Sequence, residues 1–142
     1  MSKRKILLEE ITTEFHAIKN KMHAKMMHKN KGNITHSQEF ALFTISQSKD
    51  TGIKEISKML CTSSSAATQL VNELVKQGYV IRRTNSKDKR ALHLEVSKKG
   101  HAQILKTKLQ HSKIISSLFS SLTNRELKNF IALNKKILNN IL

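Results

Sequence analysis

The chain has 142 residues, with 26 lysines and arginines against 10 aspartates and glutamates, and its formal net charge at pH 7 is +16. This length is typical of one domain with a helical extension, and the charge predicts a polyanionic partner, although a merely basic surface is the alternative. No apolar run reaches the roughly 20 residues of a membrane span. Acids follow the first apolar residues, which argues against a targeting segment, and the single cysteine excludes an intrachain disulfide and fits a reducing cytoplasm.

Two helices are predicted before residue 50. The first covers residues 4–29, and its apolar residues recur at steps of three and four: Leu7, Leu8, Ile11, Phe15, Ile18, Met22 and Met26. A capping box of Thr35 and Gln38 opens the second helix, over residues 37–46. The buried side of this second helix is assigned to Phe40, Ala41, Leu42 and Phe43.

Residues 52–100 carry the pattern around which the rest of the chain is organised. Two helices are predicted over 53–60 and 65–77, separated by a short polar break, and two extended runs follow over 79–83 and 91–96. This order is typical of a winged helix-turn-helix. The residues expected to face the core are Ile56, Met59 and Leu60 on the first helix, Ala67, Leu70, Val71 and Leu74 on the second, and Val80, Leu92, Leu94 and Val96 on the hairpin.

The second helix of this pair presents small polar side chains on its outward side. The residues assigned to DNA contact there are Ser63, Ser64, Ser65, Thr68, Gln69 and Asn72. A serine at position 63 or 64 can cap the helix, and the free N–H groups of the first turn suit a phosphate. Small hydroxyls and amides let a helix enter the major groove, where Gln and Asn can pair with adenine. An ordinary polar helix face is the alternative, and the basic hairpin that follows favours DNA.

The hairpin carries most of the predicted phosphate contacts, and its outward side is assigned to Arg82, His93 and Glu95. The residues assigned to DNA contact on this wing are Arg82, Arg83, Lys87, Asp88, Lys89 and Arg90. Asp88 can hold the guanidinium of Arg90 in one pose for the narrow minor groove, although a weak surface ion pair is the alternative. Two lysines of the first helix of the pair are expected to add phosphate contacts: Lys54 and Lys58.

Two further amphipathic helices are predicted after the hairpin. Ser97 caps the first, and Thr123 and Glu126 form a capping box for the second. Their apolar residues are Ile104, Leu105, Leu109, Ile114, Ile115, Leu118, Phe119 and Leu122, followed by Leu127, Phe130, Ile131, Leu133, Ile137, Leu138 and Ile141. Such a stripe predicts pairing with a second copy of the chain, with an intramolecular bundle as the alternative.

The predicted fold class is mainly α with a small wing of two or three β-strands. Residues 34–97 are assigned to the winged helix-turn-helix DNA-binding domain, and residues 1–33 and 98–142 to a helical dimerisation region. No cofactor and no bound metal are expected, and no contact with a membrane.

The motifs, taken in order, resemble those of the MarR family of transcriptional regulators. The matching residues are Ile34, Thr35 and Gln38, then Ile53, Ile56 and Leu60, then Ser65, Thr68, Leu70, Val71, Leu74, Gly78, Tyr79, Val80 and Arg82, and on the wing Asp88, Arg90, Leu94, Val96, Ser97 and Gly100. The resemblance implies a homodimer on double-stranded, pseudo-palindromic promoter DNA, acting in the cytoplasm on the bacterial or archaeal nucleoid as a repressor. Many relatives carry Arg at the position of Gln69, so the base preference is expected to differ.

The resemblance also implies a switch, for which three candidates remain open. Cys61 precedes the DNA-reading helix and is a candidate redox sensor, although a small buried cysteine is the plainer interpretation. A metal site would use histidines, but no two of them stand four residues apart on one helix. These histidines are His16, His23, His28, His36, His101 and His111. A small aromatic ligand between the dimer helices and the winged domain is the third candidate.

Three rival functions differ from sequence-specific regulation. An enzyme has little support, because there is no glycine-rich phosphate loop and no nucleophile with a base at a usable spacing. A sequence-blind, nucleoid-type DNA-binding protein would be served equally well by the net charge of +16. A winged helix that binds an acidic protein is the third rival.

Overall fold

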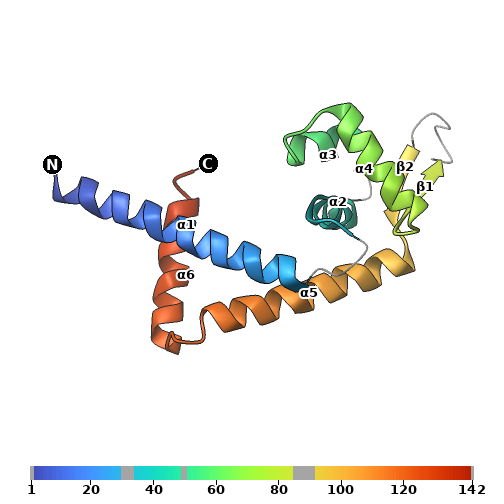
Figure 1. Cartoon of the computed structure of the whole chain (residues 1–142). Coiled ribbons are helices and arrows are strands. Elements are labelled where there is room, and N and C mark those ends of the chain that lie inside the picture. The colour runs from blue at the N-terminus through green and yellow to red at the C-terminus, as the bar shows by residue number, and fades with distance from the viewer. Residues whose placement is uncertain (1, 30–33, 49–50, 85–91, 142) are drawn as a thin grey trace. The chain divides into compact units, whose positions relative to one another are not determined.

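The computed structural model describes the backbone of residues 2–29, 34–48, 51–84 and 92–141. Its elements are α1 (Lys3–Lys29), α2 (His36–Gln47), α3 (Ile53–Met59), α4 (Ser64–Lys76), β1 (Val80–Thr84), β2 (Leu92–Val96), α5 (Lys98–Leu118) and α6 (Asn124–Leu138) (Figure 1). The predicted fold class, mainly helical with a small β wing, is confirmed. No helix among the described residues is both long and apolar enough to cross a membrane.

The chain divides into two compact units. The central unit is Lys29–Leu109, and the end unit combines Met1–His28 with Gln110–Leu142. The first turns of α5 belong to the central unit because Ile104 packs against its core and the Thr107 hydroxyl donates to the Glu39 carboxylate at 3.0 Å.

The core of the central unit is built by α2, α3, α4 and the hairpin. Leu42, Ile56 and Val71 are among its fully buried side chains. On α4 the buried residues recur as Ala67, Val71 and Leu74, a helical spacing that turns one face inward, and Leu70 is partly buried beside them. The predicted inward face of α4 is therefore confirmed.

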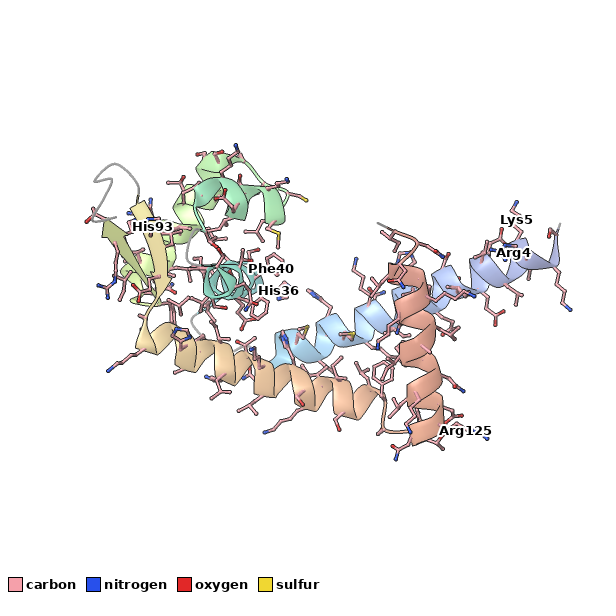
Figure 2. The ribbon with its side chains drawn as sticks, turned by 180° about the vertical axis from the view of Figure 1, so that it is seen from behind. Arg4, Lys5, His36, Phe40, His93 and Arg125 are labelled. Carbon is pink, nitrogen blue, oxygen red and sulfur yellow. The ribbon has the colours of Figure 1, made fainter. Side chains whose placement is uncertain are left out.

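Three assignments to the core were wrong. Phe40 and Phe43 are 38% and 41% exposed, because the buried stripe of α2 runs through Ala41, Leu42 and Ile45 at helical spacing. Figure 2 shows Phe40 on α2. The Lys108 ammonium lies 5.6 Å from the centre of the Phe43 ring. On α3, Ile56 is buried and Leu60 partly so, but Met59 is 56% exposed.

A compact junction joins the end of α4 to the hairpin and to α5. Gly78 adopts a left-handed conformation with φ +78°, which ends α4. The Ser97 hydroxyl donates to the Gly78 carbonyl at 2.6 Å and accepts from the Gly100 N–H at 3.0 Å, so the predicted cap by Ser97 is confirmed. Gly100 has no room for a side chain, because a Cβ there would lie 2.3 Å from the Tyr79 carbonyl oxygen. The junction therefore fixes where the wing starts relative to α4.

The strands β1 and β2 are antiparallel, and the register pairs Val80 with Val96 and Arg82 with Leu94. Directly paired residues share one face of a sheet. Arg82 therefore lies on the face of Val80 and Leu94, and the prediction that it shares a face with His93 was wrong. Its side chain is exposed, because it lies beyond the last core contact of β1 and its guanidinium meets a polar side chain of α4.

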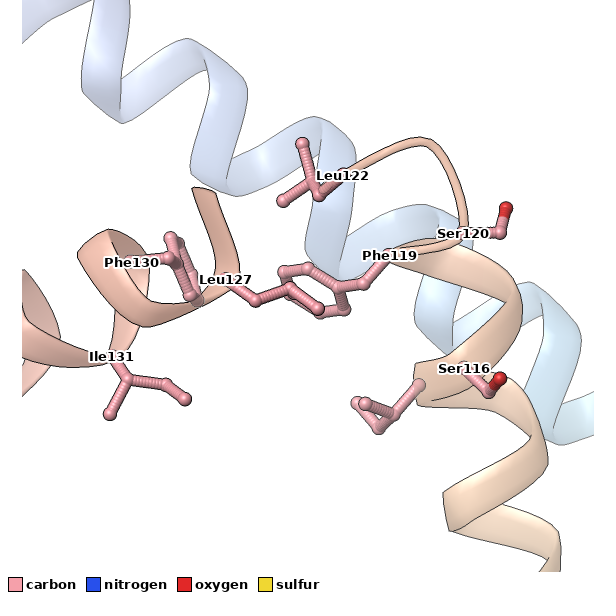
Figure 3. Close-up of a pocket in the computed structure, with 8 residues that line it drawn as sticks. Ser116, Phe119, Ser120, Leu122, Leu127, Phe130 and Ile131 are labelled. Carbon is pink, nitrogen blue, oxygen red and sulfur yellow. The ribbon is translucent and has the colours of Figure 1, made fainter. Parts of the chain in front are cut away.

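In the end unit the predicted capping box of α6 is confirmed, with Thr123 as the N-cap and Glu126 completing it. The Lys25 ammonium donates to the Ser117 hydroxyl at 2.7 Å, which links α1 to α5. Phe119 and Phe130 stack at a tilt, with ring centres 5.3 Å apart, at the corner between α5 and α6. A mainly apolar pocket of about 500 Å³ opens at this corner (Figure 3).

Candidate nucleic-acid interface

The outward face of α4 is an uninterrupted strip of small polar side chains. All of its assigned residues in the helix are exposed: Ser64, Ser65, Thr68, Gln69 and Asn72. The opposite face is closed, since Ala67, Val71 and Leu74 have no exposed surface. Because the opposite face of α4 packs into the core, the polar strip faces away from the core. Its residues are spaced three and four positions apart, as on one face of a helix.

Ser63 is the N-cap of α4, as one of the two serines was predicted to be. Its hydroxyl oxygen accepts from the Ala66 N–H at 3.1 Å. The backbone N–H groups of Ser64 and Ser65 have no acceptor inside the helix, because the carbonyls that would accept from the first turn would have to come from a preceding helical turn. Ser63 thus shapes the helix start, and the first turn offers backbone donors to an anion such as a phosphate.

Two outward residues differ in the hydrogen bonds they already make. The Thr68 hydroxyl donates to the Ser64 carbonyl at 2.7 Å, so it offers its lone pairs and its methyl group to a ligand. The Gln69 side chain makes no hydrogen bond with the part of the chain that the structure describes, and its amide keeps both a donor and an acceptor. The face therefore presents chemically distinct groups at neighbouring positions.

The two arginines of β1 are held by different partners. Arg82 donates through Nη2 to the Asn72 side-chain oxygen, which joins the wing to α4. Arg83 forms an ion pair with Glu95 of β2, on the other face of the hairpin. The sequence pattern did not reveal either pairing, because both depend on the strand register. Arg82 and Asn72 are brought together at the edge of the polar strip.

The remaining predicted DNA contacts fall into two groups. Lys54 and Lys58 are exposed on α3. The pKa of their neighbour Glu55 lies below its usual value, because its carboxylate accepts from its own N–H and from that of Gly52.

The residues of the wing tip lie outside the described residues: Lys87, Asp88, Lys89 and Arg90.

Cys61 lies in the turn between α3 and α4, exposed to solvent. It has a left-handed backbone with φ 50°, and its thiol lies 3.8 Å from the Lys58 carbonyl oxygen. The expectation of a small buried cysteine was therefore wrong, because the left-handed turn carries the side chain outward. In the part of the chain that the structure describes, no three His, Cys, Asp or Glu side chains gather where they could hold one metal ion.

Comparison with known proteins shows which family the chain resembles. Residues 34–92 match the model of the MarR family. Transcriptional repressor MprA of Escherichia coli (strain K12) is 29% identical over 103 residues, which cover 71% of this chain and 58% of MprA. The chain thus spans less than two thirds of the length of this curated relative.

Solved structures share the fold along nearly the whole chain. The X-ray crystal structure of YusO protein from Bacillus subtilis superposes with a TM-score of 0.79 at 21% identity, covering 98% of this chain and 99% of YusO. A MarR family protein from Bacillus stearothermophilus gives a TM-score of 0.82 at 19% identity, covering 99% and 98%. The family match over residues 34–92 and the shared fold confirm the resemblance that the motifs predicted: the chain resembles the MarR family and has the winged helix-turn-helix fold of a solved MarR family protein.

Proposed function

We propose that the chain is a sequence-specific DNA-binding transcriptional regulator that acts as a homodimeric repressor on pseudo-palindromic promoter DNA. The observation that carries the proposal is the polar strip of α4. Its small exposed side chains leave room for a base edge, and Arg82 and Arg83 lie on the adjacent strand. A helix with bulky outward residues could not approach the floor of the major groove as closely.

Binding combines electrostatic attraction with base readout. The net charge of +16 attracts the phosphate backbone, and each phosphate neutralised by Lys or Arg steepens the fall of affinity with salt, with a slope near −0.9 on logarithmic axes. The first turn of α4 adds backbone donors for a phosphate. Thr68 and Gln69 then reach base edges, and Gln69 pairs with adenine through its free amide. The wing tip, with Arg90, enters the minor groove beside it.

The end unit supports the homodimer, because many of its large apolar side chains are exposed, and exposed apolar patches mark protein–protein contact surfaces. The exposed residues include Ile6, Leu7, Leu8, Ile11, Phe15 and Ile18 on α1, and Phe130, Ile131, Leu133, Ile137 and Leu138 on α6. A second copy that covers them also supplies a second α4, as a two-fold operator requires. We assign residues 1–33 and 98–142 to this role, and the pocket that Phe119 and Phe130 help to line to the surface that the second copy covers.

Repression and its release complete the proposal. MprA, the relative from Escherichia coli, is a transcriptional repressor. We propose that this chain also represses, as a dimer that occupies promoter DNA in the cytoplasm and excludes polymerase. A small ligand is the proposed releasing signal. Oxidation of Cys61 is the second candidate, since the thiol is exposed directly before α4. A Cys61→Ser variant that still loses DNA on peroxide treatment would remove that candidate.

Fluorescence anisotropy tests the proposal. Labelled DNA from upstream of the chain's own gene is titrated with protein at two salt concentrations, and a scrambled duplex of equal length and composition serves as the control. The expected result is a preference of about 10³ or more for the upstream DNA, with a steep loss of affinity at the higher salt.

The other outcomes of this titration separate the rival functions. Equal and strongly salt-dependent binding to both duplexes contradicts sequence-specific regulation and favours a nucleoid-type protein, which the same charge would serve. No binding to either duplex at low salt favours a winged helix that binds an acidic protein.

A further inference from the structure

Asn72 and Arg82 form one hydrogen-bonded unit at the edge of the polar strip. The guanidinium of Arg82 can only donate, because Arg has five N–H groups and no acceptor. Its contact with Asn72 therefore fixes which way the Asn72 amide points. The side-chain oxygen of Asn72 faces Arg82, and the two N–H donors of the amide face away from it.

This orientation determines what Asn72 can recognise. Pairing with adenine needs an amide oxygen to accept from the adenine amino group and an amide N–H to donate to N7. The oxygen of Asn72 has a second lone pair, but an amino group approaching it would lie beside the positive charge of Arg82. The unit as a whole presents N–H donors. Donors are matched by the acceptor edges of guanine, at N7 and O6, and of thymine, at O4.

We infer that Asn72 reads guanine or thymine, and that Arg82 is the positioning residue that prevents it from reading adenine. The inference rests on the proposed function and deepens it by assigning a base class to one position of the site. It differs from the plain expectation that an asparagine on a recognition helix selects adenine.

Gln69 sharpens the inference, because it carries the same amide group one turn earlier on the same face. Its side chain has no hydrogen-bond partner within the described residues, so no described contact fixes the orientation of its amide, which can offer the adenine pattern. Two amides of α4 therefore read different bases, and the difference comes from a residue of the wing.

Arg83 provides the matched control for Arg82. Both are exposed arginines of β1, and replacing either with alanine removes one positive charge. Arg83 pairs with Glu95, however, and makes no hydrogen bond or ion pair with α4 among the described residues. An effect on base preference that follows Arg82 alone therefore separates positioning of Asn72 from loss of charge.

The test is selection from a pool of random duplex DNA, with sequencing of the bound fraction, by the wild-type chain and three variants. Asn72→Ala locates the base pair that residue 72 contacts, since its preference disappears there. At this pair the wild type is expected to favour guanine or thymine over adenine by about fivefold or more. Arg82→Ala frees the amide and is expected to shift the preference at the same pair to adenine. Arg83→Ala is expected to lower affinity and leave the preference unchanged.

The remaining outcomes overturn the inference or the function beneath it. A wild-type preference for adenine at that pair, an unchanged preference in Arg82→Ala, an equal shift in Arg83→Ala, or no pair that responds to Asn72→Ala overturns the inference while specific binding by the wild type stands. A wild type that enriches no sequence overturns the proposed function, and the inference with it. Thermal melting by circular dichroism confirms that each variant is folded, as expected for exposed side chains.

Discussion

The helices α4 and α6 are both amphipathic and both start at a capping hydroxyl, Ser63 and Thr123. Their apolar faces differ in how far they are buried. On α4, Leu74 has no exposed surface, whereas on α6 Leu138 is 61% exposed. The central unit closes its core with its own α2, α3 and hairpin. The end unit leaves an apolar face without cover in the described chain. An amphipathic stripe therefore predicts that a face will be buried, but not whether the covering surface comes from the same molecule.

The largest expected effect contrasts two leucines. Leu74→Ala should lower the free energy of unfolding by about 2–5 kcal/mol, because it leaves a cavity in a closed core. Leu138→Ala should act mainly on association and weaken the dimer roughly tenfold or more, because burying a leucine side chain contributes about 1.5–3 kcal/mol. Urea unfolding at several protein concentrations and sedimentation equilibrium measure the two effects.

Concentration dependence separates the two leucines further. The loss for Leu74→Ala should be the same at every protein concentration, whereas that for Leu138→Ala should be near zero at concentrations where both proteins are monomeric and should grow to a plateau as they dimerise. A Leu138→Ala chain that sediments and unfolds like the wild type would contradict the proposed dimer surface.

Gly100→Ala tests the junction that orients the wing. The added Cβ would lie 2.3 Å from the Tyr79 carbonyl oxygen and 2.6 Å from a methyl group of Val96. Overpacking of this kind typically costs about 1–3 kcal/mol, and we expect a lower melting temperature of the central unit. Gly52→Ala is the control, since its nearest contact would be the flexible Glu55 carboxylate at 3.1 Å. Equal stability of the two variants would show that the junction tolerates a shift.

Cys61→Gly should stabilise the central unit by up to about 1 kcal/mol. A residue other than glycine in the left-handed region costs about 1–2 kcal/mol, and Cys61 has φ 50°. The greater freedom of glycine in the unfolded chain offsets part of that gain. Thermal unfolding checks the sign, with Cys61→Ala as the control that keeps the strain. A Cys61→Gly chain that is less stable than Cys61→Ala would refute the strain argument.

The smallest expected effect is on the loss of thermal stability at low pH, through the N-terminal cap of α6. The pKa of Glu126 lies below its ordinary value of 4.5, because its carboxylate accepts from the backbone N–H and then the hydroxyl of Thr123. A lowered pKa means that the carboxylate stabilises the folded state at pH values above 4.5 and loses this contribution as the pH falls through the folded pKa. The melting temperature of Glu126→Gln should therefore fall less than that of the wild type between pH 6 and pH 3. An identical fall in both proteins would count against this cap.

Regular local patterns could be predicted from the sequence, and contacts set by register could not. The Thr35 capping box and the inward face of α4 follow from the spacing of a few neighbouring residues, and both are confirmed. Phe40 was assigned to the core because a large apolar side chain was assumed to be buried. Its position around the helix axis, however, decides whether a side chain of α2 faces the core. The contact between Asn72 and Arg82 joins residues ten positions apart across a turn, so it depends on where the strand starts.

Native mass spectrometry of the protein–DNA complex tests the central claim most directly. The chain is mixed with equal amounts of an upstream or selected duplex and a scrambled duplex that differ in mass. The proposed dimer predicts a complex of two chains on one specific duplex, which outcompetes the scrambled DNA, because two paired end units would present two α4 helices to two half-sites. A single chain per duplex, or equal occupancy of both duplexes, would contradict it.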